Sequence, residues 1–276
     1  MGASTLISWT DATWNFAVGC SKVDSDCKFC YMYRMSLKGK RYNPKTVRKT
    51  TTVFNLPLKL EKPSLVFAPS MSDPFHVDID SFRHEVFDII HKCPQHTFQL
   101  LTKRPERILD NLPKFWDELR GHVWLGTSIG SPTGLQRAFE LLKARKVADT
   151  LFLSLEPLHQ KLDFKDLHDP ASISGDDQFE ILRKFDWVII GGESGNESGP
   201  YRYRPCQLDW IETIVEQCME AKVPVYVKQL GTYLSGQLGL KHRHGEDIEE
   251  WPEHLRIRQM PYCYKGVRDY QNGVIK

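Results

Sequence analysis

Short apolar runs recur along the chain, and most of them are followed by a stretch in which apolar residues have helical spacing. The runs that predict strands lie at residues 65–68, 97–101, 122–126, 150–155, 187–190 and 223–227. The helical stripes lie at residues 82–90, 135–142 and 208–218. Strands that are apolar almost throughout are typical of a sheet covered on both faces, and strand–helix alternation is typical of a parallel sheet. The pattern therefore predicts an α/β fold.

Polar or charged residues follow nearly every predicted strand. In a βα barrel the strand ends form one rim that carries the active site, whereas a doubly wound open sheet gathers its functional residues at one switch point. We therefore expect a partial or complete TIM-like (βα) barrel of six to eight units, with a doubly wound sheet as the alternative. The strand-end residues are Ser70, Asp73, Lys103, Arg104, Ser128, Glu156, Glu193 and Lys228.

No linker divides the sequence, so residues 1–276 are expected to form a single domain. Residues from about 158 to 185 are polar and weakly periodic, which is typical of an insertion between regular elements. From about residue 232 to 276 the pattern becomes irregular, and this part is expected to be a C-terminal elaboration.

Composition narrows the class of protein. The chain has 276 residues, 41% of them hydrophobic and 26% charged, as in an ordinary globular protein. The net charge of +2 argues against a whole-surface attraction to nucleic acid, although it leaves a local basic groove open. The sequence has neither an apolar run of about 20 residues nor the start of a signal peptide. We expect a cytoplasmic protein that does not associate with a membrane.

Three of the seven cysteines, Cys20, Cys27 and Cys30, stand together in a Cys-x6-Cys-x2-Cys loop. Three thiolates can hold an iron–sulfur cluster and leave one iron open, whereas a structural zinc site needs four ligands. Zinc and unligated thiols remain as alternatives. The candidates for a fourth zinc ligand are His76, His84, His91 and Cys93, none of which has a paired spacing.

A family resemblance rests on this loop and on segments beyond it. Residues 27–30 read Cys-Lys-Phe-Cys, which matches the Cys-x-aromatic-Cys end of the radical S-adenosylmethionine (SAM) signature. That superfamily usually has three residues between its first two cysteines, whereas this chain has six. The longer loop resembles that of a phage-associated family with a three-cysteine signature. The resemblance to that family continues at residues 13–15, 19–20, 70–73, 101–105, 154–157, 191–195, 228–231 and 251–253.

The resemblance to the radical SAM superfamily implies a cofactor set and a reaction. Cys20, Cys27 and Cys30 would hold a [4Fe-4S] cluster, and SAM would chelate the fourth iron. One electron, supplied by a donor such as flavodoxin or ferredoxin, would cleave SAM to a 5′-deoxyadenosyl radical that abstracts hydrogen from a substrate. In that superfamily the end of the second strand contacts the SAM amino group. Ser70, Ser72 and Asp73 occupy that position here, and a plain strand-end turn is the alternative.

The remaining strand ends supply further candidates for binding and catalysis. Glu156 and Glu193 are candidate cofactor ligands, since the glycine pair before Glu193 lets the backbone approach a ligand closely. Lys228 and Cys206 are candidate catalytic residues. Lys228 could instead pair with Glu156 or Glu193, and Cys206 could instead be a small core residue.

The basic residues at two strand ends and in one aromatic segment bear on the substrate. Candidate phosphate contacts are Lys103, Arg104, Arg202 and Arg204. The alternative is that these residues are ordinary solvated surface charges that bind no ligand. The resemblance, with its phage association, together with these residues implies a radical-SAM-like enzyme acting on a small molecule such as a nucleobase or nucleotide, or on single-stranded nucleic acid. The alternative is a non-enzymatic iron–sulfur or zinc protein that binds nucleic acid or a protein partner.

Overall fold

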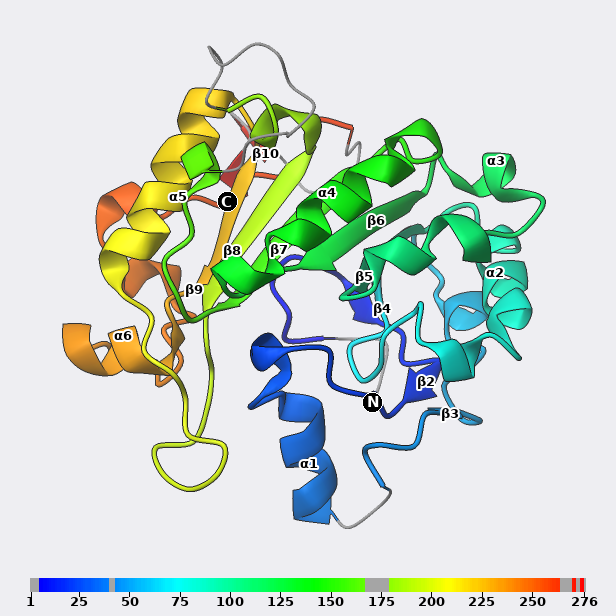
Figure 1. Ribbon diagram of the computed structural model, residues 1–276, viewed down its shortest axis with the longest axis horizontal. Coiled ribbons are helices and arrows are strands. Elements are labelled where there is room, and N and C mark those ends of the chain that lie inside the picture. Colours follow the sequence, from blue (N-terminus) through cyan, green and yellow to red (C-terminus); the bar gives the residue numbers. More distant parts are fainter. Residues whose placement is uncertain (1–4, 40–42, 167–178, 264–269, 272–273, 276) are drawn as a thin grey trace. The chain divides into compact units, whose positions relative to one another are not determined.

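The computed structural model describes residues 5–39, 43–166, 179–263, 270–271 and 274–275, and it has an α/β fold (Figure 1). The helices are α1 (Tyr31–Gly39), α2 (Arg83–His91), α3 (Trp116–Leu119), α4 (Gln136–Leu142), α5 (Leu208–Ala221) and α6 (Gly231–Leu238). None of the helices in this described part combines the length and the apolar character that crossing a bilayer requires.

Two compact units make up the chain, one of residues 1–127 and 137–151, the other of residues 128–136 and 152–276. In the first unit the parallel strand order is β1 (Ala12–Thr13), β4 (Leu65–Ala68), β5 (Thr97–Thr102), β6 (Val123–Ser128). In the second it is β7 (Leu151–Leu158), β8 (Trp187–Gly192), β9 (Val225–Gln229). Within each unit these strands follow one another in chain order, without the reversal that a doubly wound sheet requires.

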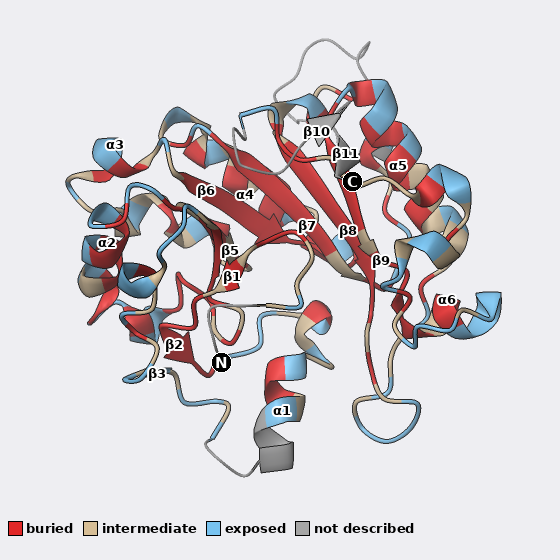
Figure 2. Cartoon of the chain, turned by 180° about the vertical axis from the view of Figure 1, so that it is seen from behind, coloured by how far each residue is buried: buried red, intermediate tan, exposed pale blue. Residues whose placement is uncertain are grey.

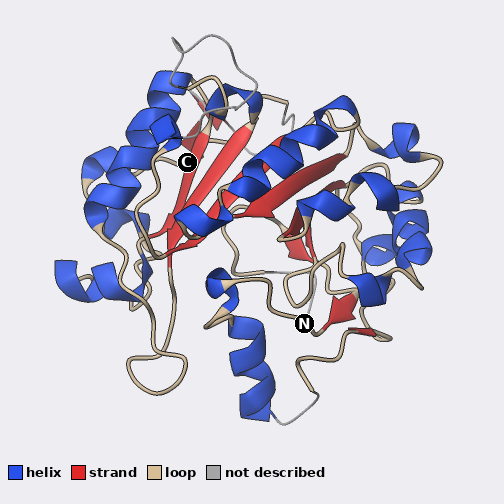
Figure 3. Ribbon diagram, viewed as in Figure 1, coloured by secondary structure: helices blue, strands red, loops and turns tan. Residues whose placement is uncertain are grey.

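Each unit also contains a small antiparallel pair of strands. In the first unit, β2 (Ala17–Val18) pairs with β3 (Arg48–Lys49). In the second, β10 (Tyr270–Gln271) pairs with β11 (Val274–Ile275). Figure 3 shows the strands in red and the helices that separate them along the chain in blue.

The parallel strands are buried along nearly their whole length, as their continuous apolar sequences predict (Figure 2). In the first unit the core is aromatic. Trp14 is fully buried, packs edge-on against the rings of Phe16, Phe54 and Phe98, and donates its indole N–H to the Phe54 carbonyl at 2.8 Å. The α/β fold and its strands are therefore set by burial on both faces of each strand.

The six strands and three helices predicted from apolar spacing are all present, with ends that differ by a few residues. The sequence pattern did not predict β1, the β2–β3 pair or α1. Residues 167–178 of the expected insertion lie outside the described residues. The expected C-terminal elaboration is partly regular, since α6 lies at its start and the Trp251 side chain is buried.

His96 makes stability depend on pH in the acid range. Its imidazole is buried, its Nε2 lies 3.2 Å from the Pro57 carbonyl oxygen, and burial lowers its pKa. The unfolded chain, in which histidine titrates near pH 6.5, therefore binds a proton before the folded chain does. The stability associated with neutral His96 is fully present above that pH and is lost as the pH falls below it.

We expect the free energy of unfolding to fall by about 1 kcal/mol more between pH 7.5 and 5.5 in the wild type than in His96→Gln. Glutamine keeps a donor for the Pro57 carbonyl but does not titrate. Denaturant titration at both pH values measures the difference, and exposed His84→Gln is the matched control. Equal pH dependence in wild type and His96→Gln would show that His96 does not contribute.

Candidate functional site

The three cysteines of the loop lie in the first unit. Cys20 follows β2, Cys27 ends a short 3-10 turn (Ser25–Cys27), and Cys30 directly precedes α1. All three are half-buried and none forms a disulfide. Cys27 interacts electrostatically with both Cys20 and Cys30. Tyr33, whose hydroxyl donates to the Cys20 carbonyl, is close enough for all three thiols to act on its pKa. The three cysteines thus lie in one segment of the first unit, and their role as ligands of one cluster stays a prediction.

Gly19 fixes the backbone at the first cysteine. Its φ of +96° is accessible to glycine, and a Cβ there would lie 2.2 Å from the Thr46 carbonyl oxygen. Its amide donates to the Met71 carbonyl at 3.0 Å, and the next amide, that of Cys20, donates to the Pro44 carbonyl at 2.9 Å. The loop is therefore held between the segment before β3 and the turn after β4.

The turn after β4 is organised by buried Asn15. Its Oδ1 accepts from the amides of Ser70 and Met71, at 2.8 and 2.9 Å, and from the Ser70 hydroxyl at 3.1 Å. The Ser72 hydroxyl donates to the Gly19 carbonyl at 2.6 Å. Ser70 and Ser72 thus hold this turn and the cysteine loop together, and their predicted contact with SAM stays a prediction.

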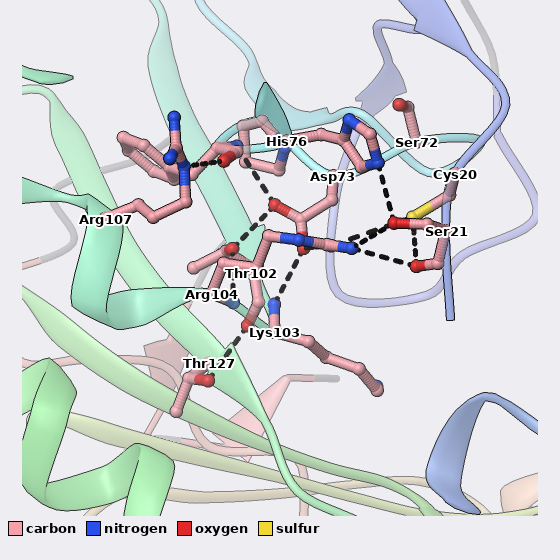
Figure 4. A network of polar contacts seen from close by, with 12 residues as sticks. Cys20, Ser21, Ser72, Asp73, His76, Thr102, Lys103, Arg104, Arg107 and Thr127 are labelled. Atoms are coloured by element: carbon pink, nitrogen blue, oxygen red, sulfur yellow. Dashed lines mark hydrogen bonds and ion pairs between the residues drawn. The ribbon is translucent and has the colours of Figure 1, made fainter. Parts of the chain in front are cut away.

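Four donors converge on the buried Asp73 carboxylate (Figure 4). Oδ1 accepts from the Phe75 amide at 2.9 Å and from the Thr102 hydroxyl at 2.6 Å. Oδ2 accepts from the Lys103 amide and from Arg104 Nη1, both at 2.9 Å. An ionised carboxylate has about four acceptor sites, so these donors use its capacity inside the protein. Asp73 thereby ties the end of β4 to the end of β5.

Arg104 carries this network on to the cysteine loop. Its Nη1 also donates to Cys20 Sγ at 3.8 Å, and its Nη2 donates to the carbonyl and hydroxyl oxygens of Ser21 at 2.9 and 2.8 Å. His76 Nε2 lies 2.8 Å from the same hydroxyl. Because His76 Nδ1 accepts from the amide two residues on, Nε2 carries the proton and donates. Burial, with Arg104 second, lowers the pKa of His76 and favours this neutral form.

Arg137 holds the part of the loop between the first two cysteines. From α4, its guanidinium pairs with Asp24, and its Nη2 donates to Asp26 Oδ2 at 2.6 Å. Asp26 is buried, and Asp24 caps the 3-10 turn by accepting from the Asp26 amide at 2.9 Å. The six intervening residues, which distinguish this motif from the usual radical SAM spacing, therefore have a defined anchor.

Burial favours the protonated forms of Cys20 and Cys30. Burial, and secondarily the Asp73 carboxylate, raises the pKa of Cys20 to about 12, and Arg104 opposes that rise. Burial also raises the pKa of Cys30, whereas the amides of Met32 and Tyr33 at the start of α1, and the Lys103 ammonium, lower it. Figure 4 shows the Lys103 side chain extending away from the Asp73–Arg104 network. Metal binding at these sulfurs would accordingly release protons.

Among the described residues, no three His, Cys, Asp or Glu side chains converge as a single metal ion would require. The candidates for a fourth zinc ligand are dispersed. His76 is bonded to Ser21, His84 is exposed on α2, His91 pairs with Glu118, and Cys93 is buried in the core. A cluster differs from a single ion in that each cysteine binds a different iron, so its sulfurs need not meet at one point.

Glu156 and Lys228 form an ion pair in the second unit. Lys228 Nζ donates to Glu156 Oε1 at 2.5 Å, and both side chains are partly exposed. Gly191 makes room for this carboxylate, since a Cβ there would lie 3.1 Å from Glu156 Cδ. The salt bridge that the sequence left as the alternative for Lys228 is thus present. A catalytic role for Lys228 stays a prediction.

Glu193 is paired with one of the predicted phosphate contacts. Its buried carboxylate accepts from Arg204 Nε at 2.8 Å and from Arg204 Nη2 at 2.7 Å. Arg202 is exposed, with its guanidinium 5.8 Å from the Tyr203 ring centroid. Cys206 is buried, and burial raises the pKa of its thiol to about 12, as is typical of a core cysteine. Their predicted binding and catalytic roles stay predictions.

Comparison with known proteins identifies the family. Residues 4–260 match the model of a family described as a protein of unknown function, DUF5131, so the chain belongs to that family. No curated protein and no solved structure matches the chain.

Several residues that hold the site were not predicted as functional. Asn15 lies inside a segment that carried the family resemblance, and His76 was considered only as a zinc ligand. Arg137 gave a weaker signal, because the only hint was a charged residue on the apolar stripe of its helix. The carboxylates that it binds lie more than 100 positions away in the sequence.

Removing Arg137 should destabilise the cysteine loop. Arg137→Met leaves two carboxylates facing each other, one of them buried, so we expect the free energy of unfolding to fall by about 3–5 kcal/mol. Amides in residues 21–27 should also exchange hydrogen faster. Arg137→Met combined with Asp26→Asn should recover a substantial part of both losses.

Exposed Lys146→Met, just after the same helix, is the matched control and should change stability by no more than about 0.5 kcal/mol. If Arg137→Met behaves like this control, the ion pairs do not hold the loop.

Proposed function

We propose that Cys20, Cys27 and Cys30 hold a [4Fe-4S] cluster with one iron that no protein side chain binds. The observation that carries the proposal is the loop itself, whose three thiols are free of disulfides and whose first cysteine is held by Gly19 and Arg104. The three-thiolate count supports a cluster with an open iron over a closed four-ligand site. The candidates for a fourth zinc ligand are dispersed, which also favours a cluster over zinc. Reduced thiols of this kind suit the cytoplasm.

SAM is the ligand that we propose for the open iron, on an open βα barrel. The chain-ordered parallel strands and the Cys-Lys-Phe-Cys run support this assignment. When bound, the cluster would supply the electron that cleaves SAM and starts radical chemistry. The protein's own part would be to hold Cys20 through Asp73 and Arg104, and the stretch between the first two cysteines through Arg137.

A nucleotide or nucleobase is the substrate class we propose. Arg202 beside Tyr203 supports it, because an exposed arginine next to an aromatic ring suits phosphate binding and base stacking. Arg104 and Arg204 are each engaged with a buried carboxylate, so Arg202 is the better supported phosphate contact.

Anaerobically purified protein should be brown and hold about four irons and four sulfides per chain. Cys30→Ala should lose most of this iron, whereas Cys93→Ala, which changes a buried cysteine at the end of α2, should retain it. Elemental analysis and visible absorption measure the outcome. One zinc per chain without iron would contradict the cluster.

Reduced protein given SAM should release 5′-deoxyadenosine, and Cys30→Ala should release none. The EPR spectrum of the reduced cluster should also change when SAM is added. A cluster whose spectrum ignores SAM, with no 5′-deoxyadenosine formed, would favour a non-enzymatic iron–sulfur protein.

A further inference from the structure

A surface cavity of about 610 Å³ lies in the first unit, between α2 and the segment that follows β3 (Figure 1). Its lining comes from residues 49–58 on one side and residues 85–92 on the other. None of the described residues that line it belongs to the cysteine loop or to the network around Asp73 and Arg104. Cavities of this volume are typical of sites for small molecules. The cavity is therefore a candidate binding site separate from the proposed cluster.

Part of the lining of this cavity is apolar. Phe54 and Ile89 are buried, whereas Leu58 is 48% exposed. Phe54 has a fixed position, since its carbonyl accepts from the Trp14 indole at 2.8 Å and its ring lies 6.5 Å from the Trp14 ring, centroid to centroid. An exposed leucine beside buried apolar residues gives an apolar group of a ligand a surface on which to lose its contact with water. We therefore expect the ligand to carry an apolar part.

The four charged side chains of the lining divide into a closed pair and an open pair. Lys49 forms an ion pair with Glu85, and its ammonium lies 4.2 Å from the centroid of the Phe54 ring. Asp88 and Lys92 are exposed and stand four residues apart, the spacing at which an acid and a base on a helix commonly pair. Within the described part of the chain, neither has an ion pair or a side-chain hydrogen bond. One carboxylate and one ammonium are thus available to a ligand.

We propose that this cavity binds a free α-amino acid with a large apolar side chain. The ammonium of the ligand pairs with Asp88, its carboxylate pairs with Lys92, and its side chain packs against Leu58 and Phe54. A ligand with a single charge satisfies only one of the two open groups, whereas a zwitterion satisfies both. The inference does not depend on the proposed cluster, because the cavity and the cysteine loop share no lining residue.

Isothermal titration calorimetry of the full chain with L-leucine tests the proposal. L-leucine should bind at one site per chain. Three analogues, each lacking one recognised group, should bind about tenfold more weakly or worse. They are 4-methylpentanoate, which is leucine without its ammonium, 3-methylbutylamine, which is leucine without its carboxylate, and L-alanine, which lacks the large side chain.

Asp88→Asn and Lys92→Gln should each raise the Kd of L-leucine about tenfold, and both change exposed side chains, so the fold should be kept. Asp110→Asn with Lys114→Gln is the matched control, because both residues are exposed, have the same spacing and do not line the cavity. Cys30→Ala should bind L-leucine as the wild type does, and loss of binding there would place the amino acid at the cysteine loop instead. The proposal is wrong if L-leucine does not bind, if the analogues bind equally well, or if Asp88→Asn and Lys92→Gln both behave like the control.

Discussion

The Asp73 carboxylate is the contact on which the candidate site depends. It is buried with four donors, and one of them, Arg104, is itself bonded to Cys20 and Ser21. Charge-assisted hydrogen bonds of this kind are strong and directional in a buried setting. Through them, the ends of two neighbouring strands fix the position of the first cysteine. The sheet of the first unit thus determines where the loop lies.

The cysteine loop is held from three directions within the first unit. Asp73 and Arg104 hold its start, Arg137 holds its middle, and the first turn of α1 follows its end. Burial raises the pKa of the Cys20 and Cys30 thiols, so a metal bound at these sulfurs would displace their protons. Arg104 beside Cys20 and Lys103 near Cys30 oppose the effect of burial and favour the thiolate at each position.

The sequence predicted the six long parallel strands well because a strand that is buried on both faces must be apolar almost throughout. Such a continuous apolar run is easy to recognise in sequence. That Cys20, Cys27 and Cys30 act together as ligands stays a prediction. The sequence could not predict the partners of Asp73 or Arg137, because those pairs join residues about 30 and more than 100 positions apart. A strand-end arginine and a helical arginine look alike in sequence. Only the fold decides that Arg104 and Arg137 bind carboxylates within the chain.

Mössbauer spectroscopy of the ⁵⁷Fe-loaded protein tests the central claim most directly, because it distinguishes irons by their ligands. Three thiolates on a [4Fe-4S] cluster predict one iron in four with a distinct signal, and that signal should shift when SAM is added. A single mononuclear iron, or four equivalent irons that do not respond to SAM, would contradict a cluster with an open iron on Cys20, Cys27 and Cys30.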